Sequence, residues 1–124
     1  MKKARPKHLA LHLIKLPISG YVSILHRISG ALLFFALPLL LLILDQSLRS
    51  IETYLNLTDI LSNPLLKVAL FGLLWAFLHH FCAGLRYLAI DLHLLPNLAA
   101  ARASSIWVLA VSLTLTVVLG VKLC

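Results

Sequence analysis

The chain has 124 residues, of which 61% are hydrophobic and 12% are charged. Soluble globular domains carry roughly 25% charged residues, and a chain of this length has room for about one domain. One small core cannot bury so much apolar surface, so the composition excludes an ordinary soluble domain and predicts a surface that faces lipid. The net charge of +7 forms no basic stripe on a soluble fold, which argues against a nucleic-acid partner.

Residues 1–18 form a basic, polar segment that contains Pro6 and Pro17. Proline is tolerated in a helix mainly in the first turn, so this segment is expected to hold little helix. The apolar run after it is longer than the roughly 7–15 residues of a signal-peptide core, and no small-residue cleavage site follows it. We therefore expect a membrane helix here and not a cleaved signal peptide.

Three stretches of the chain contain no Asp, Glu, Lys or Arg: residues 28–44, 68–85 and 103–121. A transmembrane helix needs about 20 mostly apolar residues to cross a hydrocarbon core of roughly 30 Å. Each stretch nearly reaches that length alone and reaches it with its flanks. The helices are expected near residues 20–46, 64–88 and 101–123. The predicted fold class is all-α: an integral membrane protein with three transmembrane helices, forming a single anchor domain over residues 1–124.

Basic residues are distributed unevenly around these helices. Residues 1–18 hold many of them, and Arg86 and Arg102 flank the second connection, whereas the first connection (residues 47–63) holds only Arg49. By the positive-inside rule, the N-terminal segment and the second connection are expected in the cytoplasm.

A polar stripe opens the first predicted helix. Residues three or four apart share a helix face, which places Ser19, Ser23, His26, Arg27 and Gly30 together. Ionisable groups at membrane depth are expensive and usually functional, so Arg27 at the boundary could meet an anion. The alternative is an Arg27 side chain that reaches to lipid phosphate. The accompanying serine and histidine residues argue against a face that only contacts lipid.

A face of small residues surrounds one histidine of the second predicted helix. Gly72, Ala76, His80 and Gly84 are spaced by four residues, and Tyr87 continues the face. Small residues let another body approach the backbone closely. An imidazole in such surroundings could be the axial ligand of a flat haem. A helix–helix contact in which His80 is hydrogen-bonded to a neighbour accounts for the same face equally well.

The neighbouring His79 points about 100° away from this face and lacks the glycine-lined recess. His80 is therefore the preferred ligand, and His79 is expected to pack or to form a hydrogen bond. His80 precedes Arg86 by six residues, so it lies roughly 9 Å deeper in the membrane. A haem at His80 could direct its propionates toward the polar stripe, where Ser23 and Arg27 could also bind a quinone carbonyl.

Two segments of the sequence carry the motifs of a known membrane family. They are Arg5-Pro6, Leu16-Pro17-Ile18 and Ser23-Ile24-Leu25-His26-Arg27-Ile28-Ser29-Gly30 in the first half, and His80-x-x-x-Gly84-Leu85-Arg86-x-x-x-x-Asp91 in the second. The chain resembles the cytochrome b membrane anchor of succinate dehydrogenase in these motifs, in the order of the motifs and in chain length. The resemblance covers nearly the whole chain.

The resemblance implies a role for each candidate site residue. His80 falls on the axial ligand of haem b, and the other ligand would come from a second anchor subunit that packs against this chain. His26 and Arg27 fall near the haem propionates, while Ser23 and Arg27 fall on the ubiquinone site.

Gly84 and Tyr87 would support the haem pocket according to the same resemblance. Many bacterial relatives have a histidine where this chain has Tyr87, which can donate a hydrogen bond but cannot carry positive charge. An iron–sulfur subunit and a flavoprotein subunit would dock on the cytoplasmic face of a bacterial inner membrane. FAD and the iron–sulfur clusters would lie in those subunits, so no catalytic residue is expected in this chain.

Two alternatives stay open. A fumarate reductase anchor would use similar helices with electrons flowing from quinol, because the direction depends on centres in other subunits. The other alternative is a haem-free structural anchor or a small transporter subunit. A structural anchor would tolerate His80→Ala without a change in visible spectrum. A transporter would be expected to show inverted repeats or broken helices, and the sequence displays neither.

Overall fold

The computed structural model describes residues 14–124. Residues 1–13 of the basic N-terminal segment, with the Arg5-Pro6 motif, therefore lie outside the described residues. Within residues 14–124 the chain forms helices and no strand. The helices are α1 (Ile18–Arg49), α2 (Ile51–Leu61), α3 (Pro64–Asp91) and α4 (Leu98–Leu123). The predicted all-α class is confirmed, because α1, α3 and α4 are each long and apolar enough to cross a membrane.

The three long helices begin at residues that favour a helix start. Pro17 precedes α1, and Pro64 occupies the first turn of α3, where a missing N–H removes no hydrogen bond. Asn63 and Asn97 cap α3 and α4 through side-chain oxygens that accept from Leu65 N and Ala100 N. The helices contain 32, 28 and 26 residues, so they are about 39–48 Å long at 1.5 Å per residue. That length exceeds a hydrocarbon core of roughly 30 Å.

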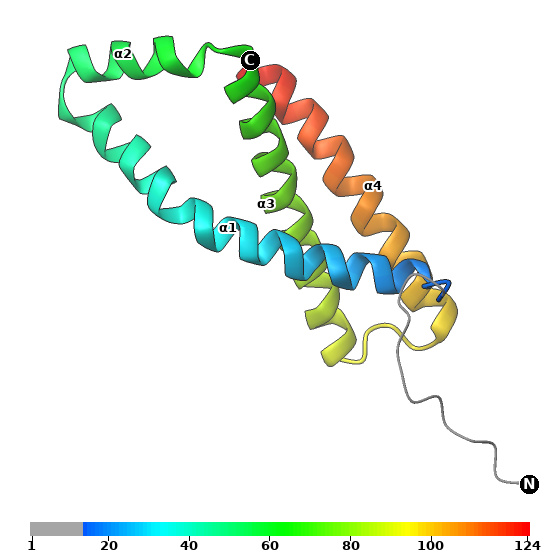
Figure 1. Cartoon of the computed structure of the whole chain (residues 1–124). Coiled ribbons are helices and arrows are strands. Elements are labelled where there is room, and N and C mark those ends of the chain that lie inside the picture. The colour runs from blue at the N-terminus through cyan, green and yellow to red at the C-terminus, as the bar shows by residue number, and fades with distance from the viewer. Residues whose placement is uncertain (1–13) are drawn as a thin grey trace, which may run out of the picture.

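The long helices run up, down and up, as Figure 1 shows. Helix α1 crosses α3 in its N-terminal half and then diverges from it, while α3 and α4 converge toward the C-terminus. The start of α1, the end of α3 and the start of α4 therefore lie at one end of the molecule. Helix α2 and the C-terminus lie at the other end.

Helix α2 lies inside the first connection and was not predicted from the sequence. It bridges the gap between the far end of α1 and the start of α3 (Figure 1). A capping box starts it: the Ser50 hydroxyl accepts from Thr53 N, and the Thr53 hydroxyl accepts from Ser50 N, both at 3.1 Å. Thr53 also donates to the Gln46 carbonyl at 2.8 Å, which ties α2 to α1. A search for long apolar runs misses such a short, partly polar helix.

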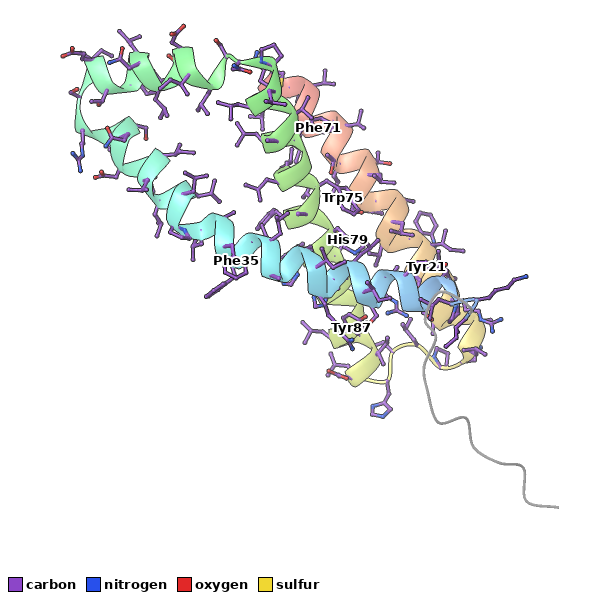
Figure 2. The ribbon with its side chains drawn as sticks, viewed as in Figure 1. Tyr21, Phe35, Phe71, Trp75, His79 and Tyr87 are labelled. Atoms are coloured by element: carbon purple, nitrogen blue, oxygen red, sulfur yellow. The ribbon has the colours of Figure 1, made fainter. Side chains whose placement is uncertain are left out.

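Most large apolar side chains lie on the outside of the bundle. Phe34 and Phe35 of α1 are 71% and 76% exposed, and Phe35 projects away from the other helices in Figure 2. The buried core is small and combines Val22, Ala83 and Val108 from the three long helices. This inversion of the soluble pattern is what a helix bundle in lipid, or one covered by other membrane subunits, requires.

Candidate functional site at the crossing of α1 and α3

Two imidazoles from different helices meet where α1 crosses α3. The rings of His26 (α1) and His80 (α3) stack with centroids 4.3 Å apart and an interplanar angle of 7°. Tyr87, about two turns further along α3, lies 5.1 Å from the His26 ring at a tilt of 59°; its position is labelled in Figure 2. The structure thus brings together three of the residues selected from the sequence.

The Nδ1 atom of His80 is held by two oxygens of α1. It lies 3.0 Å from the His26 carbonyl oxygen and 3.3 Å from Ser29 Oγ. A carbonyl oxygen can only accept, so Nδ1 must carry the proton in this contact. In the neutral imidazole this tautomer leaves the lone pair of Nε2 free for a metal. The His26 ring covers a face of the His80 ring, whereas Nε2 lies at the ring edge.

Gly30 allows the close contact between the two helices. A Cβ atom at Gly30 would lie 2.8 Å from His80 Cε1, which is closer than real side chains approach. At Gly84, a Cβ would meet only His26 Nε2, at an ordinary 3.9 Å. The recess expected beside His80 is therefore partly filled by the His26 ring. Gly30 is the glycine that the approach of His80 requires, whereas the sequence pattern had singled out Gly84.

Ser23 and Arg27 lie in the same part of α1, beside the histidine pair. Ser23 is half-buried and Arg27 is exposed. Within residues 14–124, neither side chain forms a hydrogen bond or an ion pair; the one ion pair in that range joins Arg49 and Asp45.

Ser29 and Arg86 carry contacts that the sequence interpretation did not assign. Ser29 is 3% exposed and its hydroxyl donates to the His26 carbonyl at 2.9 Å. Arg86 is 8% exposed; its Nε donates to Ser104 Oγ at 2.8 Å and its Nη2 donates to the Ala101 carbonyl at 3.2 Å. The spacing of Ser29, three residues after His26, could have indicated its position. Nothing in the sequence indicated that Arg86 would turn toward α4.

His79 is fully buried in the bundle, on the side of α3 that carries Ala83 and Arg86. Its ring lies 5.1 Å from that of Trp75, and both rings are labelled along α3 in Figure 2. The ring approaches the Val22 backbone, but within the described residues neither ring nitrogen meets the geometry of a hydrogen bond. Of the two roles expected for His79, the structure shows packing.

The fold and the site together define a multi-pass helical membrane protein with a pair of imidazoles between two spans. The chain matches the family model described as Succinate dehydrogenase/Fumarate reductase transmembrane subunit over residues 1–119. It therefore belongs to this family, as the motifs at His26 and His80 predicted.

Relatives of similar length support the same assignment. The succinate dehydrogenase cytochrome b556 subunit of Coxiella burnetii (strain RSA 493 / Nine Mile phase I) is 36% identical over 122 residues, which cover 98% of each chain. The subunits of the same name from Rickettsia felis and Rickettsia prowazekii are 32% identical over 117 residues, or 94% of this chain and 91% of theirs. The similarity thus extends over the whole three-span unit.

Proposed function

We propose that this chain is the cytochrome b membrane anchor of a succinate dehydrogenase, in which His80 ligates haem b and the start of α1 contributes to the ubiquinone site. One observation carries the proposal beyond family membership. The His26 carbonyl holds Nδ1 of His80 in its protonated form, which leaves Nε2 as a free metal ligand. Metal-bound histidines are typically held in this way by a backbone carbonyl.

The residues present fit a haem better than a metal ion held by the chain alone. Within residues 14–124, no group of three or more His, Cys, Asp or Glu residues could hold a metal ion. A haem brings four nitrogen ligands of its own and needs only axial ligands from protein. His80 would supply one of them, and a second anchor subunit would supply the other. The haem would act as a one-electron carrier beside the quinone site.

Charged and polar side chains at the crossing of α1 and α3 could bind the haem propionates and a quinone carbonyl. His26 and the exposed Arg27 can donate charge-assisted hydrogen bonds to the propionate carboxylates. Ser23 and Arg27 can donate hydrogen bonds to a quinone carbonyl. Tyr87 lies against His26 and has a hydroxyl that can donate to a propionate, although it carries no charge. Gly84 keeps the α3 side of the His26 ring clear of a side chain.

The proposed setting follows from the same assignment. The second anchor subunit would pack on the exposed apolar surface of this chain, which is otherwise covered by lipid. An iron–sulfur subunit and a flavoprotein subunit would dock on the cytoplasmic face of a bacterial inner membrane and would contain the iron–sulfur clusters and FAD. The N-terminus would lie in the cytoplasm. The names of the relatives favour succinate oxidation over fumarate reduction.

A visible spectrum tests the haem assignment. We expect a b-type signal in the dithionite-reduced minus oxidised spectrum of the detergent-purified native complex. The signal should disappear or shift in His80→Ala and persist in His79→Leu, which removes the imidazole of the buried neighbour and fills its place with an apolar side chain. The amount of each subunit, measured on the same samples, controls for assembly. A native complex without the signal, or an equal loss in both variants, would contradict the assignment.

A comparison of two activities tests the quinone assignment. Arg27→Leu should lower quinone reduction while succinate oxidation by a soluble dye stays intact, because the dye takes electrons before the quinone site. Arg49→Leu is the matched control, since Arg49 is also exposed but lies at the opposite end of α1. An equal loss of both activities in Arg27→Leu would count against a quinone contact.

A further inference from the structure

Ser29 sits between the two helices at the point where His80 is held. Its side chain is almost fully buried, and its oxygen contacts both the His26 carbonyl and Nδ1 of His80. A buried serine in a membrane helix usually satisfies its hydroxyl by donating to a carbonyl three or four residues earlier. Ser29 does this and also reaches a side chain of another helix.

The protons at this contact can be assigned from the acceptors. Ser29 has one hydroxyl proton, and its 2.9 Å contact with the His26 carbonyl uses that proton, since a carbonyl cannot donate. Toward Nδ1 the Ser29 oxygen is therefore an acceptor. The Nδ1 proton of His80 is shared between two oxygens of the same turn of α1, at 3.0 and 3.3 Å.

The fully buried hydroxyls of α4 do not share this arrangement. Ser105, Ser112 and Thr116 of α4 are at most 2% exposed. Each donates to a carbonyl of its own helix, and within the described residues none forms a hydrogen bond with a side chain of another helix. The half-buried Ser104 does form one: it donates to the Ala101 carbonyl and accepts from Arg86 Nε of α3. Ser29 differs from these three residues, and from Ser104, in its hydrogen bond to an imidazole.

We propose that Ser29 is a positioning residue that, together with the His26 carbonyl, fixes the tautomer and the ring plane of His80 and so tunes the haem. The inference rests on the proposed ligation of haem by His80. Two acceptors on one N–H restrict rotation of the ring about its Cβ–Cγ bond more than one acceptor does. They also raise the basicity of the metal-binding nitrogen. A more basic axial ligand stabilises ferric iron and lowers the reduction potential.

A redox titration of the assembled complex tests this role. In Ser29→Ala the haem midpoint potential should shift to a more positive value, and the ferric electron paramagnetic resonance signal should change because the ring plane is less constrained. Ser29→Thr keeps the hydroxyl and should restore the native potential. Ser112→Ala is the matched control: it removes another buried hydroxyl that bonds to its own helix, and it should leave both signals unchanged.

The outcomes separate this inference from the proposed function. A native haem whose potential and resonance signal are unchanged in Ser29→Ala overturns the inference and leaves His80 as the ligand. A shift of equal size in Ser112→Ala, or a Ser29→Thr complex that behaves like Ser29→Ala, also overturns it. A native complex without b-type haem overturns the proposed function and this inference together.

Discussion

The contacts of α3 with α1 and with α4 use similar residues for different purposes. Both contain glycines and buried hydroxyls. In the middle of α4, Ser112 and Thr116 donate to Leu109 and Ser112 carbonyls of their own helix, so these two hydroxyls are satisfied without α3. Near the start of α4, Arg86 of α3 donates to Ser104 and to the Ala101 carbonyl. Where α1 crosses α3, Nδ1 of His80 forms hydrogen bonds to two oxygens of α1, the His26 carbonyl oxygen and Ser29 Oγ.

This difference distinguishes the helix contact that holds the bundle together from the helix contact that forms the candidate site. In lipid there is little hydrophobic drive to join two helices, so small residues that permit close packing hold them together. The α3–α4 contact follows that rule with Ser105, Ser112, Thr116 and Gly120 buried along one face of α4. The α1–α3 crossing adds a pair of stacked imidazoles, which packing alone does not need. We therefore interpret the α3–α4 contact as the scaffold of the bundle and the α1–α3 crossing as the candidate site.

The largest expected effect is the loss of haem on substitution of Gly30. Without that loss, the distinction between the α1–α3 crossing and the α3–α4 contact would not hold. Gly30→Val places a side chain where His80 Cε1 now lies, so His80 must move away from the His26 carbonyl. Displacing the groups that orient a metal ligand typically costs 10–100-fold in affinity, so we expect haem affinity to fall by roughly tenfold or more, measured as haem retained per assembled complex during dilution. Gly72→Val is the control, because no atom lies within 4 Å of a Cβ added at Gly72. Retention of haem in Gly30→Val would show that the crossing is only a packing contact.

A smaller effect is expected for the buried arginine that ties α3 to α4. Arg86→Leu removes the hydrogen bonds to Ser104 and Ala101. Hydrogen bonds to a charged group are worth about 1.5–3 kcal/mol, so the free energy of unfolding should fall by about 2 kcal/mol. Denaturant unfolding in detergent measures the loss, with Arg102→Leu, an exposed position, as control. If folded Arg86→Leu complex lost its haem signal, Arg86 would belong to the site instead of the scaffold.

The glycine of the α3–α4 contact should give a still smaller effect, on stability alone. At Gly120 an added Cβ would overlap the ring of Phe71. Gly120→Ala should destabilise the protein by about 1 kcal/mol, the low end for overpacking, because the partly exposed Phe71 ring can turn aside. Phe71→Leu should relieve part of this loss, which a double-mutant cycle measures as non-additivity. Strict additivity would mean that the two residues do not meet.

The smallest effect is expected at the far end of α1, away from both contacts. Arg49 and Asp45 form an ion pair of 2.7 Å with side chains that are 62% and 48% exposed. Exposed pairs at this spacing contribute less than about 0.5 kcal/mol, so Arg49→Ala should change the unfolding free energy by no more than that. Haem content should stay native. A loss above about 1 kcal/mol would show that this end of α1 supports the bundle more than its exposed pair suggests.

The sequence by itself determined the three spans and the residues on each face. Charge-free apolar runs mark a membrane helix because lipid offers no partner to a charge, and a period of 3.6 residues states which side chains share a face. The motifs around His26 and His80 were therefore sufficient to indicate the family. At the level of single helices, the same period states which residues share the polar stripe and which share the small-residue face.

Only the tertiary structure decided which atoms of the two faces meet. Helical periodicity states what one helix presents, but the crossing angle and the depth of contact depend on the packing of both helices. For that reason Gly30 replaced Gly84 as the glycine that the approach of His80 requires. For the same reason Ser29 and the backbone carbonyl of His26 became the partners of His80. A carbonyl oxygen is the same at every residue, so no sequence pattern could have selected that one.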